Sequence, residues 1–150
     1  IPVTRFDIPA QIHTLHDQSF DLIIHNHVLE HLRCSDTYVV YHIHRALVRG
    51  GTHVFSVPIW PGRHYKSDFG ETNPEVLKAN FGQEDHVALY GSIGFELGLG
   101  ACLGIDSHYD LEEKVPRHLL DENHIPDKFR KGLSGSSVFL CKKEDWAFSL

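Results

Sequence analysis

Residues 20–32 read FDLIIHNHVLEHL. The first five, Phe20 to Ile24, form a nearly continuous apolar run. Such a run is typical of a strand that is buried on both faces of a parallel sheet. We therefore predict a central strand over residues 20–24, with the polar residues from His25 onward at its carboxyl end.

A helix and a second strand are predicted directly after this stretch. Ser35 or Asp36 can cap the helix. Its apolar residues recur at intervals of three and four: Val39, Val40, Ile43 and Leu47. We expect Gly50 and Gly51 to end the helix, because glycine readily adopts the left-handed conformation that follows a helix. Residues 53–57, HVFSV, are then interpreted as a second buried strand.

Strand, helix and strand in residues 20–57 make a βαβ unit, which is almost always right-handed and implies an open α/β sheet. Ligands of open α/β sheets bind beyond the carboxyl ends of the strands. Residues 58–72 leave the second strand at that end, so we expect a substrate-binding loop there. Trp60 and Tyr65 of this loop either stack on a substrate or close the edge of the core.

Local patterns predict several further elements. They are a strand over residues 3–8, a short helix after Asn73, a helix over residues 92–103, and strands over residues 105–111 and 136–141. Pro9 is expected to end the first strand, and Pro74 suits the first position of the short helix. The last two strands are expected to pair antiparallel at one edge of the sheet.

Length and charge favour one domain with a small partner. The 150 residues are 41% hydrophobic, which suffices for one core, so residues 1–150 are interpreted as a single domain. The formal net charge of -6 argues against binding to nucleic acid, and a small-molecule substrate is favoured instead. The patterns predict no oligomeric state.

Targeting and cysteine patterns favour a soluble cytoplasmic protein. No run of about 20 apolar residues is present, so no membrane span is predicted. The 3 cysteines are far apart and include no CxxC pair, which suits reduced thiols. The sequence starts at Ile1 and contains no methionine, so we expect that an N-terminal part of the protein is missing. Its loss would leave a sheet edge and an apolar face uncovered.

Two motifs in this order resemble class I S-adenosylmethionine-dependent methyltransferases, especially the type 11 group. Residues 20–32 resemble the fourth-strand segment of that group, and residues 45–52, RALVRGGT, resemble its passage from helix to fifth strand. Residues 81–91 resemble a later segment of some members. The resemblance implies a Rossmann-like open, mostly parallel sheet with flanking helices and an antiparallel edge strand. The chain would be the C-terminal two-thirds of that fold.

The resemblance also implies an activity and a cofactor site. The parent protein would transfer a methyl group from S-adenosylmethionine to a small-molecule acceptor. Asp7 and Ile8 would contact the adenine, and His25, Asn26 and His27 would line the methionine portion of the cofactor. The glycine-rich turn that holds most of the cofactor in the family would lie before Ile1, and no G-x-G-x-x-G follows a predicted strand in this chain.

Residues 27–31, HVLEH, also match the H-x-x-E-H pattern of inverzincin metalloproteases. In those enzymes two histidines one helical turn apart bind zinc, and the glutamate acts as a base. A zinc hydrolase is therefore an alternative. The pattern directly follows a predicted strand, whereas the protease chemistry requires a helix.

A third interpretation comes from metal-assisted methyltransferases that act on RNA ends and on quinone precursors. They carry E-x-x-E-H and a downstream histidine, and His27 stands here where their first glutamate would be. Glu30, His31 and His86 would then bind a divalent metal that polarises a substrate hydroxyl. The simpler alternative is that Glu30 and His31 form hydrogen bonds around the start of the following helix, without a metal.

No catalytic residue is assigned by the sequence alone, and His31 and His86 are the candidates. His86 either faces the substrate as a base or is a solvated loop histidine. Because the glycine-rich segment is absent, a non-catalytic methyltransferase-like module is a further alternative to an enzyme.

Overall fold

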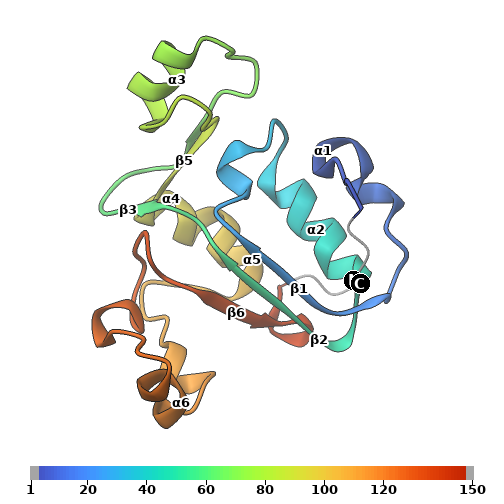
Figure 1. Ribbon diagram of the computed structural model, residues 1–150, viewed down its shortest axis with the longest axis vertical. Helices are drawn as coiled ribbons and strands as arrows, with labels where there is room; N and C mark the ends of the chain where they lie inside the picture. The colour runs from blue at the N-terminus through green and yellow to red at the C-terminus, as the bar shows by residue number, and fades with distance from the viewer. Residues whose placement is uncertain (1–3, 148–150) are drawn as a thin grey trace.

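The computed structural model describes residues 4–147 and shows a mixed α/β protein with small sheets (Figure 1). The main sheet has the order β1-β2-β6, and the second sheet has the order β3-β5-β4. The strands are β1 (Phe20–Asn26), β2 (Leu47–Ser56), β3 (Ile59–Trp60), β4 (Lys66–Ser67), β5 (Ala88–Gly91) and β6 (Phe139–Lys142).

Short helical segments connect the strands and flank the main sheet (Figure 1). The α-helices are α1 (Ile8–Gln11), α2 (Asp36–Ala46), α3 (Pro74–Phe81), α4 (Ser92–Phe95), α5 (Ala101–Leu103) and α6 (Arg117–Glu122). The other helical turns are η1 (Ile12–Thr14), η2 (Leu29–His31), η3 (Glu96–Gly100), η4 (Leu111–Glu113), η5 (Asp127–Phe129) and η6 (Lys143–Asp145). Within residues 4–147, no helix is long and apolar enough to cross a membrane.

The predicted βαβ unit is confirmed. β1 and β2 are parallel, with Leu22 opposite Thr52 and Asn26 opposite Ser56, and α2 connects them. β6 pairs antiparallel with the other side of β2, so an antiparallel edge strand is confirmed as well.

The burial of β1 differs from the prediction. β1 is an edge strand, and helices cover only one of its faces, so Ile23 and His25 are half-buried while Leu22 and Ile24 are 50% and 64% exposed. The prediction of a central strand buried on both faces is therefore wrong. Among residues 4–147, no strand pairs with the outer edge of β1.

The helix ends earlier than predicted, because α2 stops at Ala46 and the fully buried Leu47 begins β2. Phe20 pairs with Leu47 but Leu22 pairs with Thr52, so β2 bulges between these two positions. Gly50 lies in this bulge with φ +77°, a conformation that favours glycine. The two glycines thus shape the strand instead of ending the helix.

Two other strand predictions are wrong. Val3 lies outside the described residues, and residues 4–7 form no strand. Ile8 begins α1 because Asp7 accepts a hydrogen bond from the Ala10 N–H and Pro9 suits a first turn. Residues 105–111 contain only an isolated bridge from Asp110 to Lys131, so β6 finds its partner in β2 and not there.

The remaining elements largely follow the predictions. Residues 92–103 form the continuous helical run α4-η3-α5, and Asn73 caps α3 by accepting a hydrogen bond from the Glu75 N–H. The expected loop over residues 58–72 contains two short strands, β3 and β4, which pair with opposite sides of β5.

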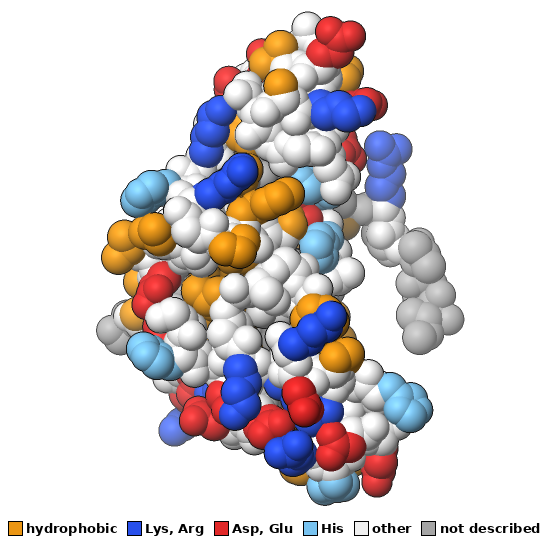
Figure 2. Space-filling view, turned by 90° about the vertical axis from the view of Figure 1, so that its left-hand side faces the viewer, with side chains coloured by type: hydrophobic (Ala, Val, Ile, Leu, Met, Phe, Trp, Pro, Cys, Tyr) orange, Lys and Arg blue, Asp and Glu red, His pale blue; other side chains and the backbone are white. Residues whose placement is uncertain are grey.

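Aromatic rings fill the core between the main sheet and α4. Phe139 lies 5.2 Å from Phe55 and 5.1 Å from Phe95, measured between ring centroids, and all three are buried. At the opposite end, near α6, ion pairs surround the buried Arg130. Figure 2 shows charged side chains crowded at that lower end and hydrophobic side chains gathered in the upper middle of the same face.

Gly91, the last residue of β5, fixes the loop that carries β3 and β4. A Cβ atom at this position would lie 1.9 Å from the Arg63 carbonyl oxygen, which itself accepts hydrogen bonds from Ile93 and Gly94. We expect Gly91→Ala to lower the free energy of unfolding by about 3 kcal/mol, because the backbone at Gly91 or at Arg63 must move to make room for the added methyl group.

The matched control for this substitution is Gly98→Ala, since nothing lies within 4 Å of a Cβ at Gly98. We expect that variant to be unchanged or up to about 1 kcal/mol more stable. Urea unfolding of both variants measures the difference. Equal stabilities would contradict the close approach of the two segments.

Candidate functional site

The three residues expected to line the methionine portion of a cofactor all lie at the carboxyl end of β1. The Nε2 atom of His25 lies 2.9 Å from Nε2 of His53, and the Asn26 side-chain oxygen accepts a hydrogen bond from the Ser56 hydroxyl. His27 has φ +50° and donates its N–H to the Ser56 carbonyl, which ends the pairing of β1 with β2.

The two residues expected to contact adenine lie at the start of α1. The Asp7 carboxylate accepts a hydrogen bond from the Ala10 N–H at 3.2 Å, so it acts as a helix cap. Ile8 lines an apolar cavity of about 320 Å³ between η1 and β1, and His25 lines the same cavity. Asp7, Asn26 and His27 do not line it.

These five residues do not by themselves fit the whole of S-adenosylmethionine. The cofactor carries an amino group, a carboxylate and ribose hydroxyls, all of which need polar partners when bound. Among the described residues that line the cavity, His25 is the only one with a polar side chain, and its Nε2 already contacts His53. The described residues would therefore supply only an apolar wall for this cofactor.

Glu30 is a charged residue that is completely buried at this end of the sheet. It lies in η2 and has no exposed surface, yet neither carboxylate oxygen has a hydrogen-bond partner. The Nδ1 atom of His27 lies 3.2 Å from Oε1, within ion-pair distance but without the geometry of a hydrogen bond. Burial raises the pKa of the Glu30 carboxyl, and nearby His27 and His31 oppose that rise.

His31 follows Glu30 in η2 and is oriented by Asp85. Its Nδ1 atom lies 3.3 Å from both the backbone oxygen and the carboxylate Oδ2 of Asp85. Both partners are acceptors, so Nδ1 is the ring nitrogen that donates to Asp85. This arrangement is common for histidines that bind metals, because the outer hydrogen bond fixes the tautomer and the ring orientation.

His86 approaches the same point from the segment that enters β5. It is 5% exposed, which rules out the solvated loop histidine. Burial, and next the neighbouring His31, lower its pKa, so the ring is neutral near pH 7 and one nitrogen can act as a ligand. The His31 and His86 rings meet edge to face, with 4.6 Å between their centroids.

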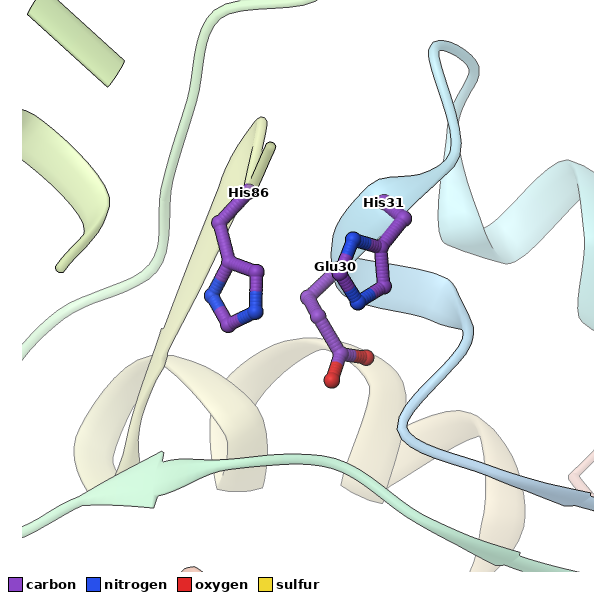
Figure 3. Close-up of side chains that lie close together, drawn as sticks. All are labelled: Glu30, His31 and His86. Carbon is purple, nitrogen blue, oxygen red and sulfur yellow. The ribbon is translucent and has the colours of Figure 1, made fainter. Parts of the chain in front are cut away.

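Glu30, His31 and His86 thus converge from two segments (Figure 3). One ligand atom from each side chain lies within 4.8 Å of the others. Donors around a tetrahedral zinc ion are roughly 3.3 Å apart, so side-chain rotations would close the cluster around an ion. Two imidazoles and one carboxylate suit first-row divalent metals and leave further coordination positions open.

Two alternatives from the sequence do not match this geometry. His27 lies before the single turn η2 and has a left-handed backbone, so His27 and His31 are not one turn apart on a helix as H-x-x-E-H zinc hydrolases require. Glu30 and His31 form no hydrogen bond at the start of α2 either, because the Glu30 carboxylate has none and His31 contacts Asp85.

Two partners of this site have no recognisable signal in the sequence. Asp85 directly precedes His86, yet its contact with His31 spans 54 residues and has no local signal. His53 lies next to His25 only through the parallel pairing of β1 and β2. Burial lowers the pKa of His25 to about 4, and burial together with His25 lowers that of His53 to about 3.

Comparisons with protein-family models, curated proteins and solved structures find no match to this chain. The functional argument therefore rests on the side chains and their surroundings.

Proposed function

We propose that this chain is a Rossmann-like domain of an S-adenosylmethionine-dependent methyltransferase, and that Glu30, His31 and His86 bind a divalent metal at its acceptor site. The observation that carries the proposal is the Glu30 carboxylate, which is fully buried, lacks hydrogen bonds and lies beside two histidines. A buried carboxylate without hydrogen bonds is costly even with His27 at ion-pair distance, and a bound cation lowers that cost.

The position of the cluster agrees with a role in binding an acceptor. It follows the carboxyl end of β1, where ligands bind in open α/β sheets. A divalent ion supplies Lewis-acid polarisation, which lowers the pKa of an acceptor hydroxyl. Asp85 contacts the Nδ1 atom of His31 through its backbone oxygen and its carboxylate, so it helps to orient the His31 ring.

S-adenosylmethionine, the cofactor that the resemblance implies, supplies a methyl group already activated by a positively charged sulfur. This chain would contribute the Ile8 and His25 wall of its pocket. The acceptor would be a small molecule with a hydroxyl group, and the net charge of -6 favours such a partner over nucleic acid.

Calorimetric titration of S-adenosylhomocysteine into the natural full-length protein tests the methyltransferase proposal. We expect micromolar binding that a metal chelator leaves unchanged, and transfer of a labelled methyl group to hydroxyl acceptors that the chelator abolishes. Absence of both binding and transfer would refute the methyltransferase proposal. The metal site is measured separately and does not depend on that result.

The second candidate is a non-catalytic methyltransferase-like module. The specific observation in its favour is that Asp7, His25 and Asn26 are occupied by contacts within the chain. It predicts that S-adenosylhomocysteine does not bind, whereas the metal still does.

A further inference from the structure

A second cavity, of about 260 Å³, lies beside the start of α2. We call it the Asp36 cavity. Its walls include Asp36 of α2, Tyr65 of the loop before β4, Tyr90 of β5, Phe95 of α4, and Gly94 and Gly98. Within residues 4–147, no Lys, Arg or His side chain lines it. Segments that are far apart in the sequence thus enclose one carboxylate with three aromatic rings.

The Asp36 carboxylate has no counter-charge in the described part of the chain. Its Oδ1 atom accepts a hydrogen bond from the Thr37 N–H at 2.7 Å, and no basic side chain lies within ion-pair distance. Burial raises its pKa, and its charge in turn contributes to raised pKa values of the neighbouring Tyr65 and Cys102. The cavity therefore presents one carboxyl group with no basic side chain beside it among the described residues.

Asp36 lies in the first turn of α2, but capping of that helix does not explain why the buried Tyr90 hydroxyl lies beside it. The Tyr90 side chain has no exposed surface and lines the cavity, and its hydroxyl faces the Asp36 carboxyl without a hydrogen bond of normal geometry. A buried hydroxyl without a partner is rare in native proteins. The Asp36 carboxyl and the Tyr90 hydroxyl therefore face each other at the wall of the cavity.

The aromatic walls favour a cation over a neutral molecule. The Tyr90 ring centroid lies 5.4 Å from that of Tyr65 and 6.4 Å from that of Phe95. Aromatic faces attract ammonium groups, and more strongly where water is excluded. One carboxylate without histidines or cysteines on the walls is a poor ligand set for a metal ion.

We propose that the Asp36 cavity binds a small organic cation, with its ammonium group held between the Asp36 carboxylate and the rings of Tyr65 and Tyr90. The site is distinct from the Glu30 cluster and does not rest on methyl transfer. Gly98 lies at the exposed rim, where a Cβ would meet nothing within 4 Å, so molecules of modest size can enter.

Choline is the test molecule, and its neutral isostere 3,3-dimethylbutan-1-ol is the matched control. Amide and aromatic NMR shifts are followed during titration of each into the protein. We expect shifts at Asp36, Tyr90 and Gly98 for choline, and affinity at least about tenfold lower for the isostere. Equal affinities, or shifts elsewhere only, would overturn the proposal.

Two variants locate the site. Asp36→Asn keeps an oxygen for the Thr37 N–H, so we expect a folded protein that binds choline at least about tenfold more weakly. Asp68→Asn is the control, because Asp68 also accepts only from backbone N–H groups and lies outside the cavity. Gly98→Leu should block the rim and abolish binding. Unchanged choline affinity in either Asp36→Asn or Gly98→Leu would overturn the proposal.

Discussion

Glu30→Gln is expected to weaken binding of Zn²⁺ by more than about 100-fold, because it removes the buried charge that a cation would neutralise. His86→Ala should have an effect of similar size, since it removes one of two imidazole ligands. Titration calorimetry with a competing chelator measures both affinities, and cobalt substitution reports the coordination through its visible spectrum.

Matched controls separate ligand loss from unfolding. Glu84→Gln changes an exposed carboxylate that pairs only with Lys78, and His108→Ala changes an imidazole that is 90% exposed. Both should bind Zn²⁺ like the natural protein. Without metal, Glu30→Gln should be at least as stable as the natural chain, because it removes a buried carboxylate that has no hydrogen bond. Equal affinities in the Glu30 and Glu84 variants would exclude the proposed ligand set.

Acidification below pH 6.5 is expected to destabilise the protein through the pair of His25 and His53. Their folded pKa values, about 4 and about 3, lie below the unfolded value of 6.5. The unfolded chain therefore binds protons first, so the contribution of the pair to stability is complete well above pH 6.5 and falls as the pH drops toward 3. From pH 6.5 to 4.5 the expected loss from the pair is roughly 4 kcal/mol.

Other groups change stability over the same range. His86 has a lowered pKa and adds to the loss, whereas Glu30 and Asp36 have raised pKa values and act in the opposite direction. A double variant, His25→Leu with His53→Phe, isolates the pair. Urea unfolding at several pH values should show a much weaker pH dependence for it. His108→Gln is the control, and a double variant as acid-sensitive as that control would contradict the assignment.

The parts of the fold that were predicted correctly depend on local periodicity. The apolar run before His25 and the spacing of Val39, Val40 and Ile43 are local signals, and β1, α2 and β2 follow them. The wrong predictions concern features that depend on contacts between residues far apart in the sequence. Gly50 shapes a bulge because Leu47 is drawn into the core, and Leu22 is exposed because no helix covers that face of β1.

Part of the candidate site was also predicted from local patterns in the sequence. Glu30 and His31 are neighbours in one motif, and His86 entered through a resemblance, so the sequence named all three. Their burial and the missing hydrogen bonds of Glu30 depend on how η2 packs against β5, where Val87 donates its N–H to the Glu30 carbonyl. Asp36 and Tyr90 meet through packing of the same kind, which no spacing in the sequence reveals.

X-ray absorption at the zinc edge of tag-free protein with one equivalent of Zn²⁺ tests the metal site most directly. The proposal predicts nitrogen and oxygen neighbours at about 2.0–2.1 Å, including the outer-ring pattern of two imidazoles, and loss of that pattern in His86→Ala. Sulfur neighbours at about 2.3 Å would assign the zinc to cysteines, and a spectrum of hydrated zinc would mean that no site exists. Either result would contradict a metal centre built from Glu30, His31 and His86.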